Sequence, residues 1–154
     1  AAIVTNASGG ASPYGTRTSS TAGIISTGES WGFFCGLFFN STKYSTRPVG
    51  VEDRALLENQ IPDNSTPQLN QRTMSPPRSR GWIPFGLVWD LTDGGTEPTL
   101  TGINDLVNAY NIMQVFNAYQ ADVKTIPGLR NRLLSQNNNL QGTQVNNLVA
   151  SYGW

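Results

Sequence analysis

The feature that most constrains the fold is an apolar run over residues 24–39 in which glycine recurs at every fourth position. Gly28, Gly32 and Gly36 each weaken a helix by up to about 1 kcal/mol relative to alanine, so a β-strand is a competing interpretation. Glycine at this spacing also leaves one helical face without side chains, which lets another element approach it closely. We therefore predict a buried helix over residues 24–39.

A lone carboxylate, Glu29, lies within this run. An ionised carboxylate in apolar surroundings needs a counter-charge or a metal ion, or it takes up a proton. One interpretation is a zinc ligand, with Trp31 nearby as core or as a wall of the site. The other is a glutamate in the first turn of a helix capped by Ser26 or Thr27, where acidic side chains are favoured. Composition alone favours the second interpretation.

The composition excludes several functional classes. Histidine is absent, so no histidine zinc site, catalytic triad or imidazole base can form from this sequence alone. Ten basic residues balance ten acidic ones, which predicts no nucleic-acid partner. No segment has the roughly 18 to 20 consecutive apolar residues of a membrane span.

The location of the protein is indicated by its polar residues and its single cysteine. Only 13% of the residues are charged, and asparagine, serine and threonine are abundant, which is typical of exported proteins. Cys35 cannot form an internal disulfide and is interpreted as a small buried hydrophobe. Together these features predict a periplasmic, cell-surface or extracellular protein.

Two further pairs of acidic residues could carry chemistry. Asp90 and Asp93 are one turn apart at a predicted helix end, and capping and solvation are favoured over an acid/base pair. Glu52 and Asp53 are adjacent, so on a helix they point in different directions and a shared site is not expected. The segment from residue 62 to 80 is predicted to be a long irregular loop. Its arginines are predicted to form a solvated basic rim: Arg72, Arg78 and Arg80.

The chain is predicted to be mainly α, a compact cluster of short helices with long irregular loops. Residues 1–23 are expected to be a flexible loop or the remnant of an excised N-terminal part, and residues 24–154 a single helical subdomain. The apolar spacing predicts five more helices. They cover residues 51–59, 84–92, 103–119, 125–134 and 143–152, and Thr101 or Gly102 is the proposed cap of the third.

The order of these segments resembles the C-terminal half of secreted zincin-like metallopeptidases of Bacteroidetes type. The resemblance covers about residues 20 to 154 and includes the segments 27–34, 82–91, 112–118 and 123–133. In that family one helix carries His-Glu-x-x-His, and a second carries Glu-x-Trp-Gly or Glu-x-Trp-Ala. Only the second motif is present here, as Glu29-Ser30-Trp31-Gly32.

The resemblance implies that an intact enzyme would bind Zn²⁺ through two histidines and Glu29 and would hydrolyse peptide or protein substrates. The present chain would be a C-terminal fragment that begins at Ala1 without a methionine, inactive and without zinc on its own. Its partner would be the N-terminal part of the same protein, which would carry His-Glu-x-x-His.

Two alternatives stay open. One is a non-catalytic exported surface or binding module, in which the four tryptophans are core or glycan-stacking residues: Trp31, Trp82, Trp89 and Trp154. The other is a degenerate zincin that is kept only as a scaffold.

Overall fold

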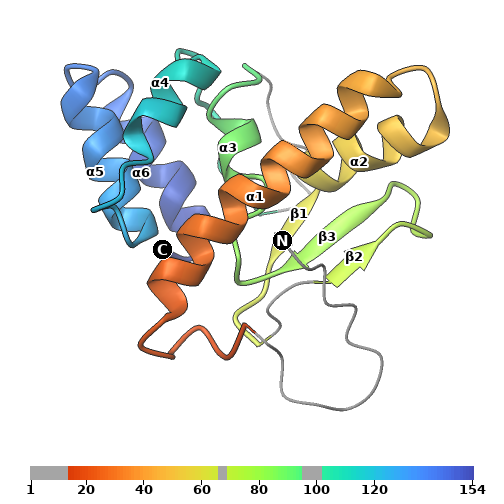
Figure 1. The fold of residues 1–154 in the computed structure, drawn as a ribbon, viewed down its shortest axis with the longest axis horizontal. Helices are drawn as coiled ribbons and strands as arrows, with labels where there is room; N and C mark the ends of the chain where they lie inside the picture. Colours follow the sequence, from red (N-terminus) through yellow and green to blue (C-terminus); the bar gives the residue numbers. More distant parts are fainter. Residues whose placement is uncertain (1–13, 66–68, 95–101) are drawn as a thin grey trace.

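The computed structural model of the chain describes residues 14–65, 69–94 and 102–154. These ranges contain six helices and one three-stranded sheet (Figure 1). The predicted mainly helical class is confirmed, but the sheet was not predicted. Among the described residues, no helix combines the length and the hydrophobicity that crossing a bilayer requires.

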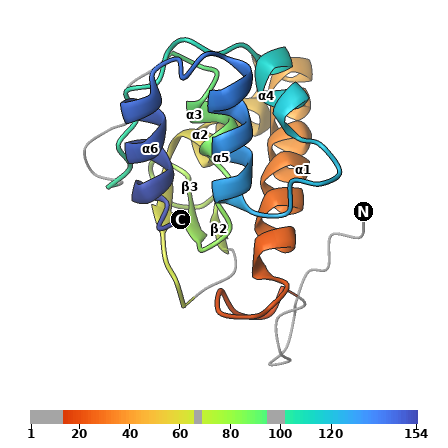
Figure 2. The same ribbon diagram turned by 90° about the vertical axis from the view of Figure 1, so that its left-hand side faces the viewer.

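The first helix, α1, covers Ala22–Lys43 and confirms the helical interpretation of the glycine-containing run. It packs against α2 (Pro48–Glu58), which was predicted over 51–59, and against α3 and α5 (Figures 1 and 2). Serine and threonine side chains on its buried side donate hydrogen bonds to carbonyls of the preceding turn, as Ser26 does to Gly23. Polar side chains can therefore lie against the core without losing hydrogen bonds.

The segment predicted to be an irregular loop contains two strands instead. The sheet consists of β1 (Gln60–Pro62), β2 (Leu69–Gln71) and β3 (Arg78–Gly81), in the order β1-β3-β2. Strand β3 pairs with β1 in parallel and with β2 antiparallel. These strands have three or four residues each and mostly polar side chains. Their formation depends on hydrogen bonds between the strands, which the spacing of apolar residues along the sequence does not reveal.

The helix predicted over residues 84–92 is much shorter. Helix α3 covers only Leu87–Asp90, and the preceding residues 82–86 are buried without forming a helix. The buried Gln60 side chain serves this segment: its amide donates to the carbonyl of Ile83 at 2.7 Å, and its oxygen accepts from the amide of Gly86 at 2.9 Å. A side chain distant in sequence therefore satisfies buried backbone groups of this non-helical segment.

The prediction of a helix over residues 103–119 is wrong for its first half, and the proposed cap Thr101 lies outside the described residues. Residues 102–110, which we call the strap, are not helical, and buried and exposed side chains alternate along them. Helix α4 (Ile112–Ala118) begins after Asn111, whose side chain accepts hydrogen bonds from the backbone of Met113 and Gln114. The strap fits the period of an extended chain, because every second side chain faces the core.

The last two helices match their predictions closely. Helix α5 covers Ile126–Gln136 and is capped by the Thr125 hydroxyl, and α6 covers Gly142–Ser151. Figure 2 shows these two helices beside each other. Their apolar stripes enter the main core as predicted, and the buried members are Leu129, Leu133, Val145, Leu148, Val149 and Tyr152. Part of the expected N-terminal loop, residues 1–13, lies outside the described residues.

Candidate functional site

Glu29 lies in the interior of α1, two turns after the helix begins at Ala22. The interpretation of Glu29 as a first-turn residue capped by Ser26 or Thr27 is therefore wrong, because both of those residues are themselves helical. The Glu29 side chain is half-buried and makes no hydrogen bond or ion pair with any described residue. Burial raises the pKa of the Glu29 carboxyl. The pKa of the Tyr14 phenol is also raised, first by burial and then by the charge of Glu29.

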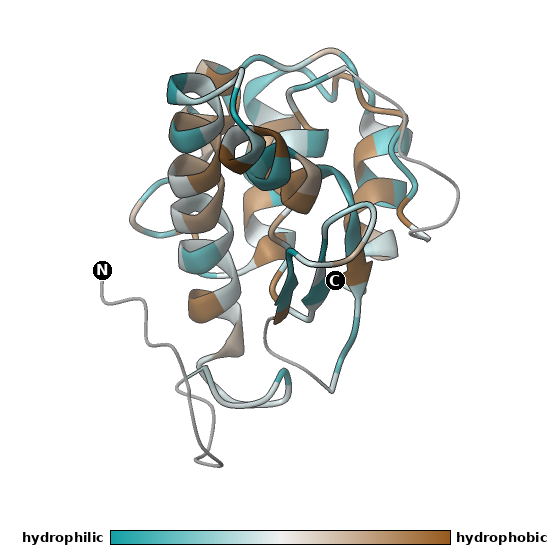
Figure 3. Cartoon of the chain, turned by 90° about the vertical axis from the view of Figure 1, so that its right-hand side faces the viewer, coloured by the Kyte–Doolittle hydropathy of each residue, from teal (hydrophilic) through white to brown (hydrophobic). Residues whose placement is uncertain are grey.

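Three of the four glycines of α1 lie on its outer side, opposite the core. A Cβ atom added at Gly28, Gly32 or Gly36 would meet no heavy atom within 4 Å. Two large apolar side chains share this side, Ile24 at 55% and Phe39 at 66% exposure. We call these five residues the glycine face, and in Figure 3 the long helix at the left is largely brown or pale along its length.

The glycine face corrects the prediction of a buried helix. The sequence indicated correctly that the glycines leave part of one side of α1 without side chains, but no described atom packs into the space that they leave. Helix α1 is buried only on the side that carries Phe34 and its serines. Cys35 is likewise partly exposed rather than buried, and its partial burial raises the pKa of the thiol, so thiolate formation is not favoured.

Trp31 forms part of a wall between α1 and α4. Its ring centroid lies 5.9 Å from that of Phe34, 5.6 Å from that of Phe116 and 5.0 Å from that of Tyr119. The Tyr119 hydroxyl in turn lies 3.0 Å from the Ser30 hydroxyl. These contacts hold Ser30 and Trp31 against α4 and the residue that follows it, whereas Glu29, two residues before Trp31, faces a different side of α1.

The other tryptophans also pack against the core. Trp82 is 1% exposed, and Trp154 packs beside it and donates its ring N–H to the Trp82 carbonyl. Trp89 donates its ring N–H to the Glu58 carboxylate at 2.6 Å and contacts Phe38. Of the two roles predicted for the tryptophans, core packing accounts for these contacts. In the described part of the chain, the tryptophan rings form no shared exposed platform.

The structure separates the two members of the predicted Asp90 and Asp93 pair. Asp90 is fully buried and accepts a hydrogen bond from the Tyr152 hydroxyl at 2.5 Å, whereas Asp93 is half-exposed just beyond α3. The prediction of a solvated capping role is therefore wrong for Asp90. Sequence reasoning did not connect Asp90 with Tyr152, because the two residues are 62 positions apart.

Glu52 and Asp53 do share a partner, contrary to prediction. The Arg72 guanidinium lies 2.6 Å from an Asp53 carboxylate oxygen and 3.8 Å from one of Glu52. Asp53 is almost fully buried, and the Asn40 side chain also donates to it. Arg80 forms a second ion pair with Asp63 at 2.7 Å. The predicted basic rim is thus largely engaged in ion pairs that connect the sheet to its surroundings.

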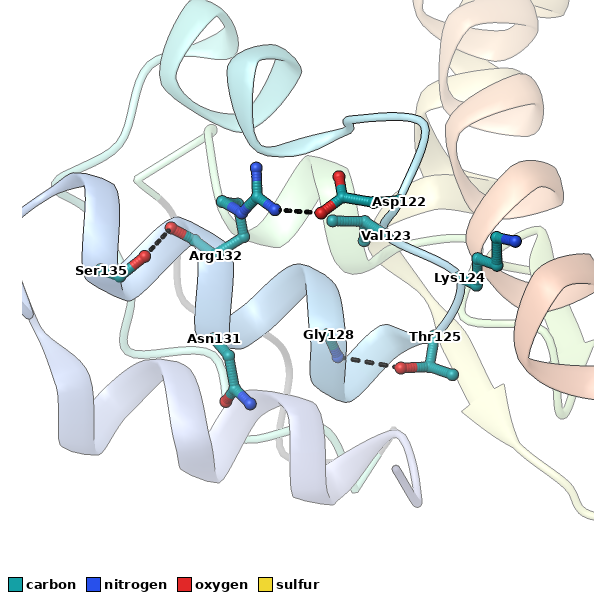
Figure 4. Close-up of a pocket in the computed structure, with 8 residues that line it drawn as sticks. All are labelled: Asp122, Val123, Lys124, Thr125, Gly128, Asn131, Arg132 and Ser135. Atoms are coloured by element: carbon teal, nitrogen blue, oxygen red, sulfur yellow. Dashed lines mark hydrogen bonds and ion pairs between the residues drawn. The ribbon is translucent and has the colours of Figure 1, made fainter.

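One hollow of the described part of the chain lies beside α5 and measures about 570 Å³ (Figure 4). Its polar groups bond to one another: Arg132 pairs with Asp122 at 2.5 Å, and the Thr125 hydroxyl accepts from the backbone of Gly128. A second hollow of about 310 Å³ lies next to the glycine face, between α1 and the segment that joins α4 to α5. Its walls include Ile24, Gly28 and Tyr119.

Within the described ranges, no three acidic or cysteine side chains lie close enough together to hold a metal ion. A metal at Glu29 would therefore need its other ligands from outside these residues. Comparisons with family models, with curated proteins and with solved structures gave no match to this chain. The candidate site thus consists of Glu29 and the glycine face beside it.

Proposed function

We propose that this chain is the C-terminal subdomain of a zinc-dependent metallopeptidase-like protein, exported from the cell, in which Glu29 is one of three protein ligands to Zn²⁺. The observation that carries the proposal is the position of Glu29 on α1. Its carboxylate is half-buried in the middle of a rigid helix and has no hydrogen-bonding or charged partner among the described residues. A bound cation would supply the counter-charge that this carboxylate lacks.

The glycine face supports the proposal because it offers a place for the missing ligands. Gly32 lies three residues after Glu29 and therefore on the same side of α1. Exposed glycines destabilise a helix, and nothing within the described residues uses the space they leave. In our proposal, the N-terminal part of the same protein packs on this face and brings two histidines of a His-Glu-x-x-His helix to Glu29.

When bound, zinc would lower the pKa of a coordinated water to about 7 and polarise a peptide carbonyl. The residues of this chain contribute the ligand and its support. Glu29 would provide a carboxylate oxygen, and the α1–α4 contacts of Trp31 and Ser30 would keep that part of the helix in a fixed position. The general base and the remaining ligands would come from the N-terminal part.

The test is to express the complete reading frame and to measure bound zinc by elemental analysis. We expect a His-Glu-x-x-His motif upstream and about one zinc per chain. Glu29→Ala should reduce zinc affinity by about 100-fold or more, since it removes a ligand directly. The matched control is Glu52→Ala, which removes a partly exposed carboxylate of α2 and should leave zinc binding unchanged.

Two results would contradict the proposal. One is a complete protein with no such motif upstream of this chain, and the other is a zinc content that Glu29→Ala leaves unaltered. A complete protein that retains the fold but binds no zinc would instead indicate a degenerate scaffold.

A further inference from the structure

We propose that the strap, residues 102–110, is a pH-sensitive latch that stays closed while Asp105 carries a proton and loosens when Asp105 loses it. This inference is independent of the zinc proposal, because it concerns a different part of the molecule. The strap is described throughout and packs into the main core through Ile103, Val107 and Tyr110.

Asp105 is the unusual residue of the strap. It occupies one of the inward positions between Ile103 and Val107, and only 4% of its surface is exposed. One carboxyl oxygen, Oδ1, accepts a hydrogen bond from the backbone N–H of Val107 at 3.2 Å. The other oxygen, Oδ2, is buried and has no hydrogen-bond partner among the residues that the structure describes. A buried carboxyl group with one unsatisfied oxygen is costly to keep in its ionised form. Keeping the same group in its neutral form costs far less.

The groups that face Asp105 are themselves acidic. Glu58 at the end of α2 and Asp93 just beyond α3 both disfavour the ionised form of Asp105. Glu58 is held in place by the Trp89 ring N–H, and Arg54 is the cation that acts on Glu58. Burial first, and then these two carboxylates, raise the pKa of Asp105 to about 7, although its hydrogen bond from Val107 acts in the opposite direction.

The sign of the pH effect follows from the raised pKa. In an open strap the pKa of Asp105 would return towards the ordinary aspartate value of about 3.9. The open strap therefore loses the proton at lower pH than the closed strap does. Closure is most favourable below about pH 4, weakens as pH rises, and levels off above about pH 7.

Side-chain hydrogen bonds also hold the strap. The backbone N–H of Asn104 donates to the Ser151 hydroxyl, Asn108 exchanges two hydrogen bonds with the Gln141 side chain, and the Tyr110 hydroxyl donates to the Leu140 carbonyl. The strap pairs with none of the described strands, so its opening does not require the sheet or a described helix to unfold. Local opening can thus respond to the charge of one residue.

The experiment is amide hydrogen exchange of the whole chain between about pH 5 and about pH 8, with rates corrected for the intrinsic effect of pH. In the wild type, we expect protection of the strap amides to fall by at least about tenfold over this range, while protection of α5 and α6 changes much less. Asp105→Asn keeps the shape of the side chain and an acceptor for Val107 but cannot ionise, so the strap should lose most of this pH dependence.

Two further variants separate the latch from a general loss of stability. Glu58→Gln removes one acidic neighbour and should make the pH-dependent loss of protection smaller. Asp122→Asn changes a largely exposed carboxylate and should behave as the wild type. The proposal is overturned if strap protection in the wild type is constant over the pH range, or if Asp105→Asn loses as much protection as the wild type.

Discussion

Single residues in this protein acquire their roles from partners that are far away in the sequence. Asp90 shows this well, because it ends the short helix α3 and yet is fully buried. The Tyr152 hydroxyl at the end of the chain donates to it at 2.5 Å. The same hydroxyl also lies against the position where Gly86 has no side chain. One polar contact thus connects α3 to the end of α6 within the core.

We expect Tyr152→Phe to lower the free energy of unfolding by about 1–3 kcal/mol, because it removes a donor from a buried carboxyl group. Tyr44→Phe is the matched control, since the Tyr44 hydroxyl makes no hydrogen bond within the described residues and its loss should have little effect. Urea denaturation measures both variants. Equal stability of Tyr152→Phe and the wild type would show that the contact contributes nothing.

At the scale of elements, glycine has opposite meanings in the first two helices. In α1, Gly28, Gly32 and Gly36 face outward and leave unused space, whereas in α2 a Cβ atom at Gly50 would collide with the backbone carbonyl of Tyr44. Gly50 is therefore needed for the close approach of α2 to the end of α1. Gly32 is not needed by any contact of the described chain.

We expect Gly50→Ala to destabilise the chain by about 1–3 kcal/mol, because the helix would have to shift away from the Tyr44 backbone. Gly32→Ala should stabilise the same chain by about 0.5–1 kcal/mol, since alanine is the better helix former and meets no obstacle. Thermal and urea unfolding of the two variants provide the test. Destabilisation by Gly32→Ala would mean that the glycine face makes contacts within the chain itself.

For the whole molecule, the connection between the sheet and the helices depends on a buried glutamine. Gln60 is 1% exposed, and its side chain bonds to the backbone of Ile83 and Gly86 across the segment that leads into α3. Strand β1, the end of β3 and the start of α3 therefore share one polar side chain. The sheet is small, so this link has a large part in holding it against the helical core.

We expect Gln60→Ala to lower the free energy of unfolding by about 2–4 kcal/mol, because it leaves buried backbone groups unpaired and opens a cavity. The control is Gln136→Ala at the exposed end of α5, which should change stability by no more than about 0.5 kcal/mol. Both values come from chemical denaturation. A loss in Gln60→Ala no greater than that of the control would contradict the role assigned to this side chain.

The sequence by itself determined the helices whose information is local. Helices α5 and α6 were predicted because their apolar residues recur at helical spacing, and α1 was predicted as a helix that carries Glu29. The strap was mispredicted because residues 103–110 also permit helical spacing, and only packing against the core selected the extended form. The small sheet has mostly polar strands, and its hydrogen bonds join segments that are distant in sequence.

The candidate site divides in the same way. Its residue, Glu29, was found from a lone carboxylate in an apolar run, and zinc binding at this residue stays a prediction. Only the tertiary structure revealed that Glu29 has no hydrogen-bonding or charged partner among the described residues, that the glycine face points outward and that Asp105 is buried beside other acids. Burial and charge proximity arise from contacts between distant segments, and no local pattern in the sequence encodes them.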